Sequence, residues 1–542
     1  MTICYNEQCK IGQKGGICTE KRDAENLIRL LPKTRSRLLR LVFSRLAVIL
    51  LLIITQIILI AAIYGMFQDF IERFKIIQTL FTISMVLYLF NEEMDSSAKL
   101  TWLWLIAMFP FPGSLLLWFT DNNFGNKRVR ERINTLIEET KTALPQNETL
   151  LSDPALQESG TRDLCHYLSR SGCFPVYQNQ AVTYYPSGES MFRSLIEELE
   201  RAEKFIFMEF FIIAEGYMWG KVLSVLSEKA RQGVDVRVMY DGMCEISSLS
   251  FDYPKRIESL GIRCKDFSPV QPFLSTHYNY RDHRKIIVID GKTAYTGGVN
   301  LADEYINQQE RFGHWKDAAV MIRGDAVRSF TLMFLQMWNI TEHTPQWEPF
   351  ISVEPECKPG SGWVIPFSDC PLDTDKVGEN IYIDILSRAR SYVHIMTPYL
   401  ILDGELENAL KFAAQRGVDV EIILPGIPDK KTAYALAKSH YRSLLDAGVK
   451  IYEYSPGFVH AKVVISDDEK AVVGTINFDY RSLYHHFECA AYLFRTDCIA
   501  DIEQDFRQTR AECRTVTAVT VQNESLYYKL LGGFLKIFSP LM

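Results

Sequence analysis

Two segments of the chain carry the same chemically active residues at the same spacing. They read DHRKIIVIDGKTAYTGGVN (282–300) and VHAKVVISDDEKAVVGTIN (459–477), and each contains the pattern His-x-Lys-x4-Asp. The pattern residues are His283, Lys285 and Asp290 in the first segment and His460, Lys462 and Asp467 in the second. One copy could arise by chance in a lysine-rich strand. Two copies, each followed by Gly and Asn at matching offsets, indicate one paired catalytic site.

An imidazole beside an ammonium group is suited to phosphodiester exchange. One imidazole would attack phosphorus and hold the phosphoryl group, while the other would protonate the leaving alkoxide and then deprotonate the incoming hydroxyl. The two lysines, with Asn300 and Asn477, would bind the non-bridging oxygens where negative charge develops. Because lysine supplies this charge, the pattern predicts that neither a metal ion nor another cofactor is required.

Each imidazole also needs a carboxylate to hold its second ring nitrogen and to stabilise the imidazolium form. The candidates are Asp317, which follows His283 by 34 residues, and Glu488, which follows His460 by 28 residues. These offsets place one candidate carboxylate after the histidine of each segment.

The second segment differs from the first at one position near the site. Thr475 stands where the first segment has Gly298. The hydroxyl of Thr475 is a candidate hydrogen-bond donor to phosphate, which glycine cannot provide through a side chain. His485 and His486 are expected to be structural or to line the pocket.

The strands around these residues explain the spacing. Residues two apart on a strand share a face, so each His-Lys pair would point the same way. The apolar runs 286–289 and 463–465 are typical of buried strands. Asp-Gly at 290–291 and Asp-Asp at 467–468 would reverse the chain, and the returning strand would bring the asparagine beside the histidine.

A longer repeat predicts two similar halves. In each half, a helical pattern lies between two strand-like stretches. The stretches are KFIFMEFFI (204–212) and RQGVDVRVMYDG (231–242) in the first half. They are YVHIMTPYL (392–400) and QRGVDVEIILPG (415–426) in the second. Such βαβ units predict an α/β fold with two duplicated sandwich halves related by a pseudo-two-fold axis. Prolines and glycines concentrate at the division, so the expected halves are residues 155–345 and 346–542.

Apolar runs predict a membrane region at 41–120, between a basic N-terminal segment (1–40) and a linker (121–154). The runs 41–67 and 100–119 are long enough to span a bilayer as transmembrane helices, and the run 76–90 is marginal. Lysines and arginines flank both ends of this region, so an even number of crossings is expected, two being the simplest. The catalytic part would then lie in the cytoplasm, which agrees with twelve cysteines that form no paired motif.

The C-terminal tail, residues 526–542, is rich in apolar and aromatic side chains. Such a segment would either lie on the membrane surface or pack as a helix on the domain. The sequence favours neither arrangement over the other.

The paired motifs resemble those of the phospholipase D superfamily. Within it, several stretches are similar to bacterial cardiolipin synthases: NYRDHRKIIVIDG (279–291), GGVNLADEY (297–305), HWKD (314–317), GFVHAKVVISD (457–467), residues 96–119 and IFSPLM (537–542). The likeness extends over nearly the whole chain from about residue 40.

This resemblance implies a membrane enzyme of a bacterial cell that converts two phosphatidylglycerol molecules into cardiolipin and glycerol. It places the catalytic roles on the six pattern residues, with His283 as nucleophile and His460 as acid and base. The two motif aspartates would support the site rather than react. The order of the two histidines does not follow from the residues themselves.

Other functions use the same residues. A hydrolase would release phosphatidic acid with water as the acceptor, and pocket shape alone would distinguish the two reactions. A nuclease is disfavoured by the net charge of −7 and the apolar runs, and an inactive lipid-binding protein is disfavoured by two intact motifs. The expected partners are therefore phospholipids and the membrane rather than nucleic acid. Donor preference, oligomeric state and the role of residues 1–40 do not follow from the sequence.

Overall fold

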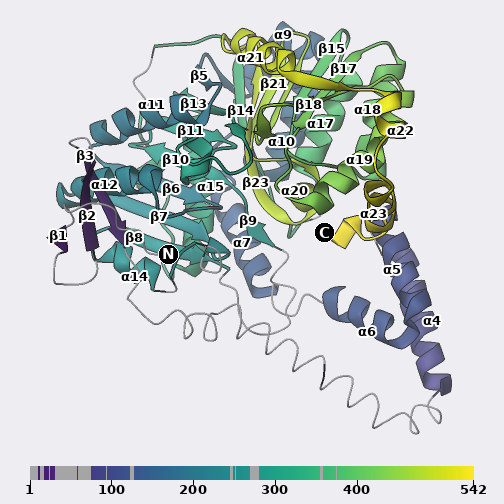
Figure 1. The fold of residues 1–542 in the computed structure, drawn as a ribbon. Coiled ribbons are helices and arrows are strands. Elements are labelled where there is room, and N and C mark those ends of the chain that lie inside the picture. Colours follow the sequence, from purple (N-terminus) through teal and green to yellow (C-terminus); the bar gives the residue numbers. More distant parts are fainter. Residues whose placement is uncertain are drawn as a thin grey trace.

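The computed structural model describes residues 10–11, 17–22, 25–30, 58, 75–92, 94–121, 127–244, 248–250, 252–268, 280–354, 358–373 and 375–541. Two α/β units lie side by side, and the helices before residue 122 project away from them (Figure 1). The predicted α/β fold is confirmed.

Each unit is built on a mixed sheet, and the two sheets have the same strand order. The first sheet runs β5-β13-β11-β10-β6-β7-β8. The second runs β14-β23-β21-β20-β15-β17-β18, with β24 added beyond β18 and β4 beyond β14. In both sheets three strands pair in parallel (β6, β7, β8 and β15, β17, β18), and the motif hairpins β10–β11 and β20–β21 are antiparallel.

The strands of the first sheet are β5 (Ala181–Tyr185), β6 (Phe205–Phe210), β7 (Asp235–Asp241), β8 (Arg263–Phe267), β10 (Lys285–Ile289), β11 (Thr293–Gly297) and β13 (Ala319–Arg323). Those of the second are β4 (Tyr177–Gln178), β14 (Trp363–Asp369), β15 (Tyr392–Met396), β17 (Asp419–Pro425), β18 (Lys450–Tyr454), β20 (Val463–Ser466), β21 (Lys470–Gly474), β23 (His486–Phe494) and β24 (Cys513–Val516).

The helices repeat in the same way. The first unit contains α11 (Gly188–Arg201), α12 (Tyr217–Arg231), α14 (Tyr253–Glu258), α15 (Val327–Trp338) and α16 (Glu348–Ile351). The second contains α17 (Val377–Arg388), α18 (Gly404–Gln415), α19 (Lys431–Asp446), α20 (Tyr480–Tyr484), α21 (Ile499–Ala511), α22 (Ala518–Gln522) and α23 (Leu526–Lys536). One buried apolar cluster includes Phe207 and Val288 from the first sheet and Ile395 and Val464 from the second, so the units share a core.

Turns with positive φ stand at matching places. Gly233 and Gly417 follow α12 and α18 with φ of 93° and 94°, a conformation that glycine adopts without steric cost. Asp290 and Asp467, at the ends of β10 and β20, also have positive φ, 54° and 56°. The strand–helix–turn–strand repeat is thus present in both units.

The described residues between the predicted membrane runs and the first sheet are largely helical. They form α7 (Lys127–Thr140), α8 (Glu148–Leu151), α9 (Pro154–Glu158) and α10 (Thr161–Gly172). Near the N-terminus, β1 (Lys10–Ile11), β2 (Ile17–Arg22) and β3 (Glu25–Leu30) form a small antiparallel sheet.

The apolar region differs from the expectation in one respect. The run 76–90 forms α4 (Lys75–Asn91), but the run 100–119 is divided into α5 (Ser96–Met108) and α6 (Pro110–Asp121). Pro110 disfavours a helical conformation at the residue before it, and Phe109 has φ −134° and ψ 76°. Gly113 lets α6 fold back onto α5, since a Cβ there would lie 2.8 Å from the Leu105 carbonyl oxygen.

Among the residues that the structure describes, no helix combines the length and the apolar content that a bilayer crossing needs. The run 41–67, apart from Ile58, lies outside the described residues.

Candidate active site

Two short strand pairs join the units and place the motif histidines. β9 (Arg281–Asp282) pairs in parallel with the start of β23, and His283 follows directly, with its backbone N–H donating to the Phe487 carbonyl at 2.9 Å. β19 (Gly457–Val459) pairs in parallel with β12 (His314–Lys316), and the N–H of His460 donates to the Lys316 carbonyl at 2.7 Å. Each histidine therefore enters the site on a strand held by the other unit.

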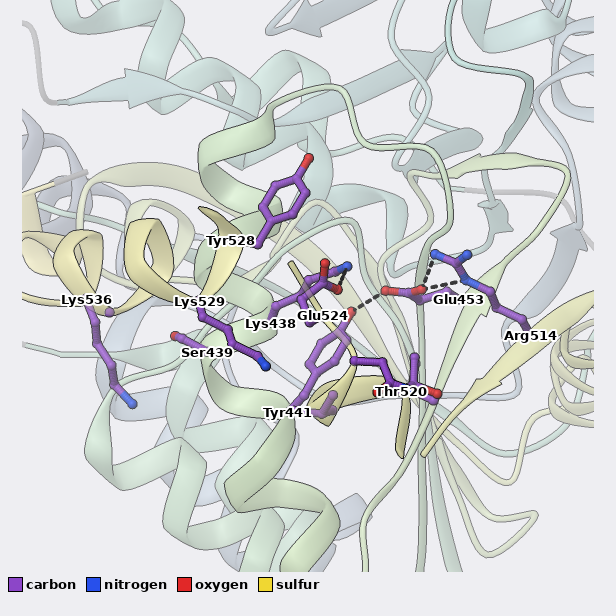
Figure 2. A pocket seen from close by; sticks show the side chains of 14 residues that line it. Lys438, Ser439, Tyr441, Glu453, Arg514, Thr520, Glu524, Tyr528, Lys529 and Lys536 are labelled. Carbon is purple, nitrogen blue, oxygen red and sulfur yellow. Dashed lines mark hydrogen bonds and ion pairs between the residues drawn. The ribbon is translucent and has the colours of Figure 1, made fainter. Parts of the chain in front are cut away.

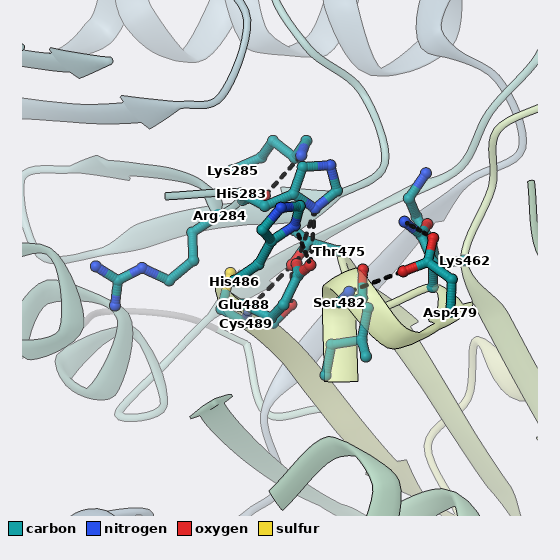
Figure 3. A network of polar contacts seen from close by, with 12 residues as sticks. His283, Arg284, Lys285, Lys462, Thr475, Asp479, Ser482, His486, Glu488 and Cys489 are labelled. Carbon is teal, nitrogen blue, oxygen red and sulfur yellow. Dashed lines mark hydrogen bonds and ion pairs between the residues drawn. The ribbon is translucent and has the colours of Figure 1, made fainter. Parts of the chain in front are cut away.

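Because of these strand pairs, each histidine contacts a carboxylate of the opposite unit. Nδ1 of His283 lies 2.9 Å from both carboxylate oxygens of Glu488 (Figure 3). Nδ1 of His460 lies 2.8 Å from Oδ2 of Asp317. The sequence offsets had placed each carboxylate with the histidine of its own segment, and this pairing was wrong. The partner in each case belongs to the opposite unit, because β9 and β19 cross between the sheets.

The difference between Gly298 and Thr475 follows from the two carboxylates. A Cβ at position 298 would lie 2.0 Å from Oδ1 of Asp317, so glycine leaves the space that this carboxylate occupies. The hydroxyl of Thr475 instead donates to Glu488, and it accepts from the Cys489 N–H at 3.0 Å. The structure thus directs Thr475 to the supporting carboxylate, not to the phosphate position that the sequence suggested.

Both motif lysines lie beside their histidines, with their side chains folded back on the chain. Nζ of Lys285 donates to the His283 carbonyl at 2.6 Å, and Nζ of Lys462 donates to the His460 carbonyl. All four side chains are almost fully buried. Each ammonium group keeps further N–H donors for an anion, since a lysine offers three.

Burial dominates the acid–base properties of the site. It lowers the pKa of Lys285 to about 8, of Lys462 to about 7 and of His460 to about 4, and it lowers the pKa of His283 well below its usual value. The positive charges of both lysines lower the pKa of both histidines further, so the two motifs share one electrostatic environment.

The two carboxylates behave differently. Burial raises the pKa of Glu488 well above its usual value, although Lys285 and the Thr475 hydroxyl oppose the rise. Burial also acts to raise the pKa of Asp317, but His460 and Lys462 outweigh it and leave that pKa lowered. Asp317 is therefore the carboxylate that holds a negative charge at neutral pH.

The motif aspartates accept hydrogen bonds from backbone N–H groups rather than facing the substrate position. The Asp290 carboxylate accepts from the backbone N–H groups of residues 203, 204 and 205 at 2.7–2.9 Å. The Asp467 carboxylate accepts from those of residues 390, 391 and 392 at 2.8–2.9 Å. Each aspartate ties the end of the motif strand to the start of the neighbouring antiparallel strand, β6 for Asp290 and β15 for Asp467.

The asparagines also have internal partners. Asn300 accepts from the Ile212 N–H at 3.0 Å and donates to the Tyr305 hydroxyl at 2.8 Å. Asn477 donates to Asp479 at 3.3 Å. Both are buried near the site, but Asn300 positions Tyr305 instead of pointing its amide at an open phosphate position.

Aromatic rings that the motif pattern does not reveal complete the site. Phe211 lies edge-on to His283 with ring centroids 4.9 Å apart, and Tyr305 lies edge-on to His460 at 5.2 Å. His486 stacks obliquely on His283 at 5.2 Å, beside Glu488 (Figure 3). Phe211 comes directly after β6, and Tyr305 lies in the short 3-10 helix Asp303–Ile306 beyond β11. Only their contact with the imidazoles distinguishes them from core aromatics.

Comparisons with known proteins agree with this geometry. A family model described as "Cardiolipin synthase, PLD-like domain" matches residues 195–338 and 382–510. A protein of Streptococcus mutans, described as uncharacterized, is 56% identical over 460 residues, which cover 85% of this chain and 100% of that protein. A cardiolipin synthase of Geobacillus sp. is 35% identical over 83% of this chain and 90% of its own length.

A second cardiolipin synthase, from Alkalihalophilus pseudofirmus, is 32% identical over 89% of this chain and 97% of its own length. Among solved structures, phosphatidylserine synthase of Haemophilus influenzae superposes with a TM-score of 0.55 at 16% identity, covering 70% of this chain and 98% of that one. This superposition shows a shared fold. Since the family model spans the catalytic units and the named relatives match over most of their lengths, the chain belongs to the cardiolipin synthase family of phospholipase D-like proteins.

Proposed function

We propose that the chain is a phosphatidyltransferase that makes cardiolipin and glycerol from two molecules of phosphatidylglycerol. The observation that supports this best is the pair of buried imidazoles, each held by a carboxylate of the opposite unit and flanked by a motif lysine. Such a site has a nucleophile, a proton carrier and charges for the phosphate oxygens. The names of the relatives supply the product, cardiolipin, and phosphatidylglycerol as the substrate is what the family resemblance implies.

In the first step, Nε2 of His283 attacks the phosphorus of one phosphatidylglycerol. The bond between phosphorus and the glycerol headgroup oxygen breaks, and His460 gives a proton to that oxygen, so glycerol leaves. The phosphatidyl group stays on His283. Lys285 and Lys462 stabilise the charge that builds on the non-bridging oxygens.

In the second step, a primary hydroxyl of another phosphatidylglycerol attacks the same phosphorus. His460 takes the hydroxyl proton, the P–N bond breaks, and cardiolipin leaves with His283 restored. The lowered pKa of Asp317 supports this division of roles, because a charged carboxylate stabilises the imidazolium form of His460. The negative charge of a bound phosphodiester raises the pKa of His460 toward neutrality.

We further propose that the region 41–120 attaches the enzyme to the membrane of a bacterial cell through transmembrane segments, with the two α/β units on the cytoplasmic side. Exposed apolar side chains on α4, α5 and α6, among them Ile76, Leu100 and Leu115, support membrane contact. Basic residues on both flanks favour the cytoplasm. A green fluorescent protein fused after Met542 should fluoresce in cells; a dark but full-length fusion would place that end outside.

A product assay tests the reaction. The full chain in detergent is given phosphatidylglycerol alone, and cardiolipin, glycerol and phosphatidic acid are quantified. We expect equimolar cardiolipin and glycerol, and a loss of both in His283→Ala and His460→Ala. Phosphatidic acid without cardiolipin would make the enzyme a hydrolase, and no product from phosphatidylglycerol would reject this donor.

A rapid quench in sodium dodecyl sulfate at neutral pH, which keeps the acid-labile P–N bond, distinguishes the two histidines. We expect His460→Asn to retain a slow transfer of labelled phosphatidyl onto the chain, and His283→Asn to retain none. The reverse result would exchange their roles.

A further inference from the structure

A cavity far along the chain from the motif residues lies beneath the C-terminal helix α23. Its volume is about 760 Å³, and it is bounded by α19, α22, α23, β18 and β24 (Figure 2). None of its lining residues belongs to the two motifs or supports them. The cavity is therefore separate from the candidate active site.

The charges that line the cavity leave an excess of cations. Four cationic side chains, Lys438, Arg514, Lys529 and Lys536, face two carboxylates, Glu453 and Glu524. Glu524 accepts from Lys438, and Glu453 accepts from Arg514 at 2.7 Å, as Figure 2 shows.

Two lysines remain after these pairs are formed, and both lie on α23. Nζ of Lys529 donates to the Gln522 carbonyl at 2.6 Å, and Nζ of Lys536 reaches Glu407 only at 4.0 Å. Each ammonium group offers three donors, so both lysines retain capacity for an anion. Lys529 and Lys536 stand about two turns apart along α23, and both line the cavity, where their charges suit a phosphate group.

The face of α23 that points away from the domain is apolar. Leu526, Leu530 and Phe534 recur at four-residue spacing and are more than half exposed, with Tyr527 beside them. Gly532 faces the domain, where a Cβ would lie 2.4 Å from the Ala435 carbonyl oxygen, so α23 is packed closely on α19. The helix is thus packed on the domain, one of the two arrangements that the sequence left open, and its outer apolar face stays exposed.

The end of the chain joins this helix to the apolar helices. Oγ1 of Thr101 in α5 donates to the Ile537 carbonyl at 2.5 Å, and the rings of Trp104 and Phe538 meet edge-on at 5.3 Å. α4, α5 and α23 consequently lie on one side of the molecule (Figure 1). A bilayer that meets α5 also meets the exposed face of α23.

We propose that this cavity binds the phosphate-bearing headgroup of an anionic phospholipid, separately from the reacting lipids. Lys529 and Lys536 would bind the phosphate, and Ser439 and Asn523 would hydrogen-bond the remaining polar groups. Val516, Val521 and Tyr528 line the cavity with apolar surface, while the acyl chains would follow the apolar face of α23 into the bilayer. The proposal rests on the membrane placement of α23 and on no step of the proposed reaction.

Direct binding on the full chain in detergent tests this site. The probe is radiolabelled phosphatidic acid at a fixed mole fraction in micelles, and lipid bound per chain is measured by equilibrium gel filtration. Phosphatidylcholine and inorganic phosphate are run as parallel probes. Wild type is compared with the double variant Lys529→Gln, Lys536→Gln, and with the matched control Lys255→Gln, Lys431→Gln, which changes two exposed lysines outside the cavity.

We expect wild type and the control to bind about one more phosphatidic acid per chain than the double variant, with apparent affinity lowered at least tenfold in that variant. No difference should appear with phosphatidylcholine or phosphate. Equal binding by all three proteins, or an equal loss in the control, would overturn the proposal. Binding of inorganic phosphate that depends on the same two lysines would make it a site for free phosphate instead.

A second variant changes the volume of the cavity without changing its charge. Gly533 lines the cavity, and a Cβ there meets no heavy atom within 4 Å, so Gly533→Trp should fold and fill the space. It should lose the same lipid as the lysine variant, and full retention would contradict the proposal. Because no turnover is measured, absence of a cardiolipin product would reject the proposed function while leaving this result unaffected.

Discussion

At the residue scale, two identical motifs stand in unequal surroundings. The imidazole of His283 contacts Glu488, which also accepts a hydrogen bond from Thr475 and lies beside His486. The imidazole of His460 contacts Asp317, and the residue beside that carboxylate is Gly298, where the other half has Thr475. The inequality lies in the carboxylates and their neighbours rather than in the motif residues. A step that needs a stable imidazolium is therefore better served by His460.

The hydroxyl of Thr475 should affect the reaction rate through its hydrogen bond to Glu488. Thr475→Val leaves a buried oxygen of Glu488 without this donor, a loss of about 1–3 kcal/mol, so we expect kcat to fall by about fivefold or more. Thr475→Ser retains the hydroxyl and should recover most of the rate. Steady-state kinetics of both variants on phosphatidylglycerol checks this, with thermal unfolding as a control for folding. Equal rates for valine and serine would mean that Thr475 does not act through its hydroxyl.

The lowered pKa values of the lysines predict an alkaline limit. A lysine binds phosphate only while protonated, so kcat/KM should fall as pH rises above about 7, the pKa of Lys462. Arginine stays charged throughout this range, so Lys462→Arg should move the fall toward pH 8, where Lys285 loses its proton. The measurement is kcat/KM between pH 6 and 9.5. The control Lys431→Arg changes a surface lysine and should leave the dependence of kcat/KM on pH unchanged. If the alkaline fall in kcat/KM of Lys462→Arg stays at the wild-type pH, it does not report the proton of Lys462.

At the scale of elements, the hairpins that carry the motifs are fastened by their aspartates. Asp290 and Asp467 each hold three backbone N–H groups at the end of a motif strand, and each sits in a left-handed turn. This explains why the motif contains an aspartate five residues beyond the lysine. Its task is to fix the strand on which the lysine sits.

Replacing Asp290 should therefore cost stability more than chemistry. Asp290→Asn weakens three charge-assisted hydrogen bonds in a buried place, and we expect a loss of about 2–4 kcal/mol in unfolding free energy. Asp467 is more exposed, so Asp467→Asn should cost less. Denaturant unfolding gives the stabilities, and kcat at low temperature should stay within about threefold of wild type. A large loss of kcat in folded Asp290→Asn would instead indicate a direct role in the reaction.

At the scale of the whole molecule, the apolar helices and α23 occupy one side, so the surface that would meet lipid is built from segments more than 400 residues apart in the sequence. Thr101 and Trp104 come from α5, and Ile537 and Phe538 from the C-terminal residues. A helix that is held in this way presents its apolar face in a fixed orientation.

Negative charges on the exposed face of α23 should lower the activity on bilayer substrates without changing the active site. For the double variant Leu530→Glu, Phe534→Glu, we expect at least fivefold less activity on phosphatidylglycerol in vesicles and unchanged activity in detergent micelles, because only the vesicle requires insertion of this face. Phe412→Glu, on the exposed side of α18, is the matched control. Equal losses in vesicles and micelles would show that the face supports folding rather than membrane contact.

The repeat, the strands that carry it and the positions of the paired motif residues could all be predicted from the sequence. These depend on local patterns: alternating apolar residues, turns such as those at Gly233 and Gly417, and two copies of one spacing. The sequence did not determine the break at Phe109 and Pro110, since the apolar run continues through it, nor the fold-back that Gly113 permits.

Only the tertiary structure decided which carboxylate serves which histidine. His283 and Glu488 are 205 residues apart and His460 and Asp317 are 143 apart. In a duplicated chain, the carboxylate of either half has a sequence offset that fits, so spacing cannot choose between them. The choice is made by β9 pairing with β23 and β19 pairing with β12, contacts that exist only once the two units have packed together.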